Sequence, residues 1–136
     1  MSCVYLLAAS HPLRLCDSAL RRLRAVKVGR TDFTVEEDGF SVQPHEYYRC
    51  AVNDLALDMQ PYRYELNLAP TREDAAQLRA YLSKNCARGE TVELWRLWVG
   101  GETYRVRRFF GPLSALEQDT LEQLEEHPQT CLTITI

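Results

Sequence analysis

The stretch Tyr62-Arg-Tyr-Glu-Leu-Asn-Leu68 and the helical pattern that follows it decide the fold class. Aromatic and leucine residues alternate here with polar ones, as in a strand that buries one face. Thr71, with Asp74 three residues later, predicts a helix start, because a hydroxyl there can accept from the exposed amides of the first turn. The buried stripe of this helix would be Ala75, Leu78, Leu82 and Cys86, before a stop at Gly89. A strand joined to a helix in this way indicates an α+β fold.

Three further patterns continue the order toward residue 136. Residues 91–99 predict a strand, Gly100-Gly101 a two-residue turn, and residues 102–110 the returning strand. Ser114 with Glu117 forms a capping box that opens a second helix, which ends before Pro128. Residues 131–136 alternate as a final strand. Residues 62–136 therefore predict the ferredoxin-like order βαββαβ, an antiparallel sheet with two helices on one face.

The first 61 residues predict an extension merged with that unit. The expected elements are a buried strand over 3–9, a helix over 13–26, and a hairpin of 33–37 with 40–43 around Asp38-Gly39. Residues 44–61 are open to strand, loop or short helix. No Gly-, Ser- or Pro-rich linker divides the chain. We therefore expect one domain over 1–136, with an antiparallel or mixed sheet.

Composition excludes several classes of protein. The chain has 136 residues, a formal charge of −3, 46% apolar residues and 26% charged residues, as in an average globular domain. The negative charge argues against wholesale binding to nucleic acid or to an anionic membrane. No apolar run approaches the length of a membrane span. The chain has five cysteines, an odd number, and no two of them are close in sequence. This pattern favours free cysteines in a reducing cytoplasm over a framework of disulfides.

No motif for catalysis or metal binding is found. His45-Glu46 begins like the zinc-protease helix motif, but Arg49 stands where the second imidazole is required. No two cysteines have the spacing of zinc ligands. His11 and His127 each precede a proline and are interpreted as ordinary loop residues. We therefore expect no catalytic residue, no metal and no cofactor.

One sheet face combines arginine with aromatic residues. If the chain turns at Gly100-Gly101, Arg96 lies directly across from Arg105, and two arginines so placed repel unless an anion lies between them. The complete set of expected partner-binding residues is Arg96, Trp98, Arg105, Arg107, Phe109 and Arg63. Arginine and aromatic residues dominate the energetics of recognition surfaces. Two alternatives are internal: Glu65 pairs with the arginines, or residues 1–61 fold over the face.

The leading functional hypothesis is a non-catalytic binding module for an acidic protein partner. Its size and acidity are similar to those of toxin-neutralising immunity proteins, an analogy of size and fold only. One alternative is a small enzyme with a site around His45–Arg49. Another is single-stranded RNA binding, in which bases stack on the sheet, although the negative charge makes nucleic acid an unfavourable partner. A homodimer is compatible with the expected free strand edges.

Overall fold

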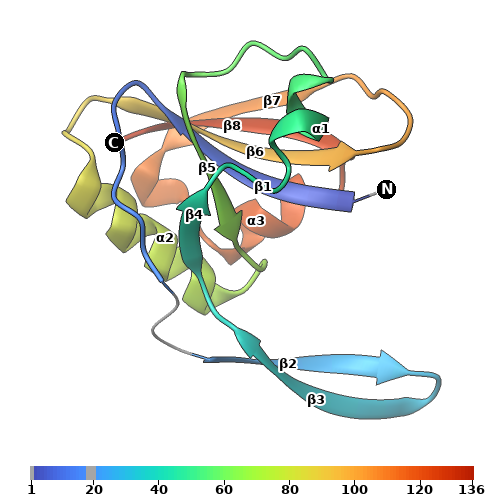
Figure 1. The fold of residues 1–136 in the computed structure, drawn as a ribbon. Helices are drawn as coiled ribbons and strands as arrows, with labels where there is room; N and C mark the ends of the chain where they lie inside the picture. The colour runs from blue at the N-terminus through green and yellow to red at the C-terminus, as the bar shows by residue number, and fades with distance from the viewer. Residues whose placement is uncertain (1, 18–20) are drawn as a thin grey trace.

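The computed structural model describes residues 2–17 and 21–136 and shows a mixed α+β fold (Figure 1), which confirms the predicted class. The main sheet contains β1 (Ser2–Ala9), β4 (Ser41–Pro44), β5 (Tyr62–Asn67), β6 (Thr91–Val99), β7 (Arg107–Pro112) and β8 (Gln129–Thr135). Their spatial order is β4-β5-β1-β6-β8-β7. β7 runs parallel to β8, and the other neighbours are antiparallel, so the sheet is mixed.

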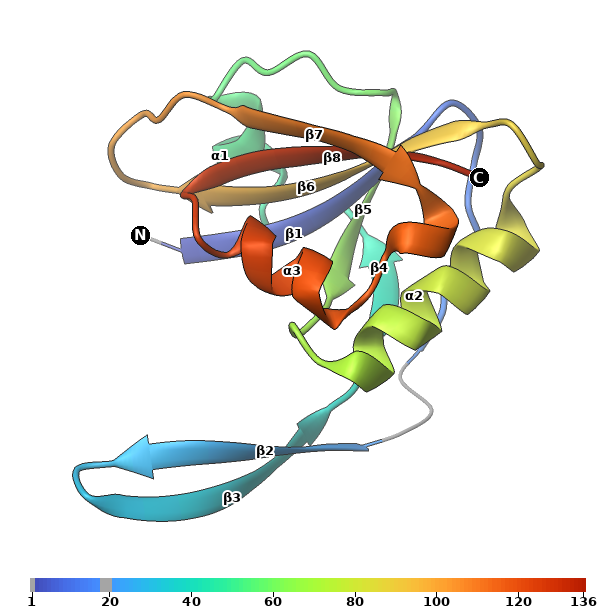
Figure 2. The ribbon, with the colours of Figure 1, turned by 180° about the vertical axis from the view of Figure 1, so that it is seen from behind.

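Both faces of the sheet are covered. The helices α2 (Arg72–Asn85) and α3 (Gln118–Leu124) lie on one face, together with the short 3-10 turn η1 (Leu113–Ala115) (Figure 2). The opposite face carries α1 (Arg49–Asn53) and the connection over residues 54–61 (Figure 1). The sequence predicts helices on one face only. α1 corrects this, and it comes from the stretch that the sequence left open.

The two faces bury separate apolar clusters. Under α2 and α3 lie residues that include Tyr5, Leu7, Leu78, Leu82, Val92, Leu94, Leu121, Leu132 and Ile134. Under α1 lie Val4, Leu6, Ala8, Val52, Met59, Trp95, Leu97, Val99 and Cys131. β1 is central, and both Leu6 and Leu7 are fully buried. A strand covered on both faces reads as a continuous apolar run, which explains the sequence of β1.

The predicted helix over 13–26 is wrong. Residues 18–20 of that range lie outside the described residues, and from Arg21 the chain is the strand β2 (Arg21–Val28). β2 pairs with β3 (Thr31–Asp38) in a separate two-stranded sheet that projects from the body (Figure 1). The apparent helical spacing combines residues from two separate structures. Leu13 lies in the main core and Cys16 forms a β-bridge with Val42, whereas the residues from Arg21 onward belong to the hairpin.

The predicted hairpin around Asp38-Gly39 is also wrong. β3 pairs with β2, and the chain then continues into β4, which pairs with β5. The reversal occurs between Val28 and Thr31, where Gly29 has φ +63°. Glycine adopts such positive φ values without steric cost, so the turn forms there.

The strand order does not support a ferredoxin-like segment. That arrangement needs β6 and β7 to form a hairpin, whereas β6 pairs with β1 and β8. Gly100 does have the positive φ of a turn residue, +76°, but the chain runs on without strand structure until Arg107. β7 then pairs with β8 alone. β1 takes the place beside β6 that the sequence assigns to the returning strand.

One helix start is confirmed and one is corrected. The Thr71 hydroxyl accepts from the amide of Asp74, as predicted for α2. α3 begins later than predicted, with Glu117 and Thr120 as its capping box, because residues 113–115 form η1. Within residues 2–17 and 21–136, no helix is both long and apolar enough to cross a membrane.

Candidate functional site

The residues of the expected arginine and aromatic face do not share one surface. Arg96 and Trp98 share the sheet face covered by α2 and α3, because β6 places alternate residues on each side and Val92 and Leu94 belong to that cluster. Arg105 precedes β7, Arg107 begins it, and both are exposed. The predicted opposition of Arg96 and Arg105 does not exist, since Arg96 lies opposite Tyr5 and Thr130.

Arg96 has a structural role. Only 7% of the residue is exposed, and its guanidinium donates to the carbonyl oxygen of His127 at 3.0 Å. A Glu125 carboxylate oxygen lies 3.8 Å from the guanidinium, and the ring centroid of Trp98 lies 5.8 Å away. The cation thus neutralises the carbonyl-rich end of α3 and holds it against the sheet. Tyr5, opposite Arg96, is buried as well, and its burial together with the negative charge of Glu125 raises the pKa of its hydroxyl.

Arg63 and Glu65 also serve the fold. Arg63 donates to the carbonyl oxygens of Gln60 at 3.0 Å and Met59 at 3.4 Å, which fixes the connection over the α1 face. Glu65 was the expected internal partner of the arginines. Its carboxylate instead accepts from His45 at 2.9 Å and from the backbone amide of Tyr48 at 3.0 Å.

The cluster around His45–Arg49 does not converge. The His45 side chain is 6% exposed and turned inward to Glu65, whereas Glu46 and Arg49 are exposed. His45 and Glu46 therefore share no pocket, and acid–base work needs both groups within reach of one substrate. The RNA hypothesis likewise needs an open sheet face, and both faces are covered in the described part of the chain.

Three exposed arginines gather at one edge of the sheet. We call Arg105, Arg107, Arg108 and Phe110 the arginine edge. β7 is the terminal strand of the main sheet, and its side away from β8 is an edge in the described residues. All three arginines are exposed, and Phe110 is 75% exposed. Arg105, Arg107 and Arg108 line a shallow hollow together with Val106.

The charges of the arginine edge are not neutralised within the described chain. Among residues 2–17 and 21–136, none of its arginines forms an ion pair with a carboxylate. Arg108 lies over the ring of Trp95, with its guanidinium carbon 5.4 Å from the ring centroid. Phe109 is half-buried, and its ring centroid lies 6.2 Å from that of His127. It packs against the apolar cluster under α2 and α3 and so anchors β7.

Sequence reasoning missed Arg108 and Phe110. Neither is among the expected partner-binding residues, because those follow the face of the expected hairpin that carries Arg96 and Arg105. The signal that was present is local: three of the four residues from Arg105 to Arg108 are arginine. No family model, no curated protein and no solved structure matches this chain.

Proposed function

We propose that this protein is a binding module that holds an extended acidic segment of a partner protein along the arginine edge. One observation carries the proposal: Arg107 and Arg108 on an edge strand, and Arg105 two residues before it, are exposed and form no ion pair with a carboxylate within the described residues. An edge strand offers unpaired amides and carbonyls to a further strand. Main-chain hydrogen bonds then supply affinity, and side chains at alternate positions supply specificity.

The side chains of β7 alternate between the two faces of the sheet, and this alternation determines which partner segment fits. Arg107 and Phe109 are on the α2 and α3 side of the sheet, and Arg108 and Phe110 are on the α1 side. A partner strand thus meets one exposed arginine on each side, and the exposed Phe110 adds apolar area. Gly111 and Pro112 end the strand, and proline has no amide for a further ladder bond. The segment that fits is short, extended and rich in Asp or Glu.

The test is binding of a labelled ten-residue peptide that alternates glutamate and valine, measured by fluorescence polarisation. Arg105→Glu with Arg107→Glu should weaken binding at least about tenfold, because each reversed charge repels the peptide carboxylates. Arg14→Glu with Arg49→Glu makes the same change in net charge at exposed positions elsewhere and should leave affinity nearly unchanged.

A peptide of lysine and valine provides the second control. Equal binding of both peptides, or binding of neither, would contradict the proposal and leave the arginines as guards against edge-to-edge aggregation. Equal losses of peptide affinity in the two double variants would show that binding depends on net charge alone and not on the arginine edge. Arg96→Glu is not a useful variant, because it buries a carboxylate beside Glu125.

We infer a second contact surface on the projecting hairpin, with a second copy of the chain as its occupant. Residues directly opposite in β2 and β3 share a face, so Val26, Phe33, Val35 and Val28 form one apolar face. Val28 is 62% exposed, Phe33 51% and Val35 40%. At the base of this face Arg22 and Glu37 neutralise each other at 3.1 Å. Arg24 also lies on this face, opposite Val35, and pairs with Glu37 at 3.3 Å. A two-fold dimer covers the apolar part of the face with its own copy.

A further inference from the structure

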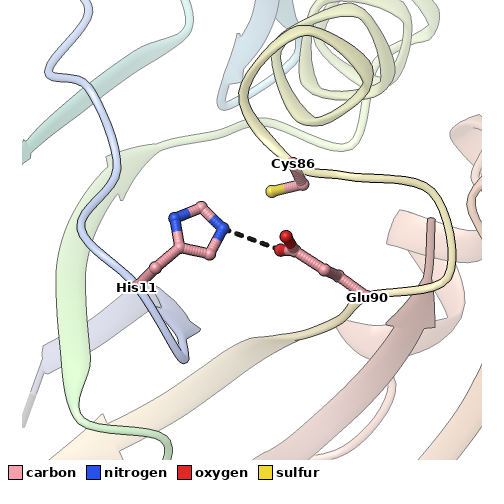
Figure 3. A group of neighbouring side chains, drawn as sticks. All are labelled: His11, Cys86 and Glu90. Atoms are coloured by element: carbon pink, nitrogen blue, oxygen red, sulfur yellow. Dashed lines mark hydrogen bonds and ion pairs between the residues drawn. The ribbon is translucent and has the colours of Figure 1, made fainter.

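Three side chains from separate parts of the chain converge beside the end of α2. His11 follows β1, Cys86 is the residue that caps the C-terminus of α2, and Glu90 directly precedes β6. Figure 3 shows the imidazole, thiol and carboxylate turned toward one space. One ligating atom from each side chain lies within 4.8 Å of the others. The arrangement is independent of the arginine edge.

The backbone fixes two of the three residues. Cys86 is extended, which ends the helix, and Gly89 has φ +91°, which turns the chain back. The Gly89 amide donates to the carbonyl oxygen of Ile136, and the Ile136 amide donates to the carbonyl oxygen of Glu90, both at 2.8 Å. The turn is therefore clamped to the strand edge, so Cys86 and Glu90 are presented by a rigid frame.

A hydrogen bond orients the third residue. His11 Nδ1 lies 3.0 Å from the carbonyl oxygen of Pro12, and Nε2 lies 2.7 Å from a carboxylate oxygen of Glu90. Both oxygens can only accept, so Nδ1 donates to the Pro12 carbonyl and Nε2 donates to Glu90, and Nε2 is the nitrogen aimed into the cluster. An imidazole that donates its other ring N–H to a backbone carbonyl is the usual arrangement of a metal-ligating histidine.

A cysteine–histidine catalytic pair does not fit this geometry. Both ring nitrogens of His11 already face oxygen acceptors, so neither is directed to abstract the thiol proton. Burial, with the negative charge of Glu90, raises the pKa of the Cys86 thiol, which is the opposite of nucleophile activation. A bound cation changes this situation, because a coordinating thiol is deprotonated by its metal.

We propose that His11, Cys86 and Glu90 bind a divalent ion of the zinc class. Imidazole nitrogen, thiolate sulfur and carboxylate oxygen are the three ligand types that zinc accepts, whereas magnesium and calcium require oxygen. Tetrahedral ligands around zinc are about 3.5 Å apart. Small side-chain movements reach this value: the 2.7 Å separation of His11 Nε2 and the Glu90 oxygen widens, and separations of up to 4.8 Å shorten. On binding, Cys86 releases its proton to solvent, and the ion replaces any proton on Nε2 of His11.

The site has room for a fourth ligand. The His11 side chain is 35% exposed and the Glu90 side chain 29%, whereas Cys86 is 9% exposed. Solvent therefore reaches the imidazole and carboxylate side of the cluster. Three protein ligands with one open position match the zinc sites that retain water. The ion ties the connection after β1 to the turn between α2 and β6.

The test is titration of the full chain with Co²⁺, followed by absorption spectroscopy for the sulfur-to-cobalt charge-transfer band. We expect one equivalent of Co²⁺ to produce the band and one equivalent of Zn²⁺ to remove it. Cys86→Ser should abolish the band. Cys50→Ser changes an exposed cysteine outside the cluster and should leave the band intact.

Glu90→Gln keeps the proposal falsifiable if Cys86→Ser does not fold, because this substitution alters a part-exposed side chain only. Its affinity for Zn²⁺, measured by calorimetry, should fall at least about tenfold, the minimum seen when groups around a metal are removed. Folding of each variant is checked by circular dichroism. No thiolate band with wild-type protein, a band lost with Cys50→Ser, or unchanged affinity in Glu90→Gln would overturn the site.

Discussion

At the residue scale, the fold depends on a buried ion pair that joins the hairpin to the body. Arg22 on β2 is 10% exposed in its side chain, and Asp74 at the start of α2 is 3% exposed. Asp74 accepts from the Arg22 guanidinium and from the amide of Ala69 at 2.9 Å. The Asp74 carboxylate thus links the base of the hairpin, through Arg22, to the segment before α2, through the Ala69 amide.

Asp74→Ala should lower the free energy of unfolding by about 3–5 kcal/mol, because it leaves Arg22 buried with only Glu37 as a partner. Urea denaturation followed by circular dichroism measures this change. Glu36→Ala is the control, since its pair with Arg21 is 60% and 57% exposed and should contribute less than about 1 kcal/mol. Similar losses in both variants would contradict the structural role of Asp74.

At the residue scale, the sequence alone predicted neither the cluster of His11, Cys86 and Glu90 nor the burial of Arg96. His11, Cys86 and Glu90 are far from any short ligand motif, so only the folded chain brings them together. The importance of arginine was predicted, but Arg96 was assigned to an exposed face. Its burial follows from the position of α3, which periodicity within one strand does not encode.

At the element scale, the hairpin β2–β3 is open to solvent on both faces, apart from its base. A two-stranded ribbon alone is only marginally stable in water. We expect backbone amides in the outer part of β2 and β3 to exchange with solvent deuterium at least about tenfold faster than those of β1 and β6. Hydrogen exchange at low protein concentration, read by NMR, checks this. Equal protection in hairpin and body would contradict it.

Elements with purely local signals were the ones that the sequence predicted well. β1, β5, β6, α2 and β8 carry period-2, continuous or capped patterns, and each was found close to its expected range. The elements that failed depend on distant partners. Residues 13–26 fit a helix by spacing, but from Arg21 onward their pairing with β3 makes them a strand. Gly100-Gly101 has turn composition, yet β1 occupies the edge of β6 that the returning strand needed.

At the scale of the whole molecule, the apolar hairpin face should make association depend on protein concentration. We expect sedimentation velocity to show a dimer at high concentration, because two copies bury Val26, Val28, Phe33 and Val35 of each. Phe33→Glu should return the protein to a monomer. Leu23→Glu is the matched control, since Leu23 is 71% exposed on the opposite face of the same hairpin.

A monomer at every concentration would contradict the inferred dimer, and so would a dimer that Leu23→Glu disrupts as strongly as Phe33→Glu. The arginine edge lies on β7 and just before it, outside the hairpin, so neither result alters the peptide-binding test. The two surfaces can therefore be examined separately in one molecule.

The central position of β1 has a consequence for biosynthesis. β1 lies between β5 and β6, so its partners are made long after it leaves the ribosome. At about 5–20 residues per second, the interval from residue 9 to residue 67, where the first partner β5 ends, is roughly 3–12 seconds. During that interval the apolar run from Val4 to Ala9 has no sheet to join. The nascent chain is therefore a natural client for a chaperone that binds short hydrophobic segments.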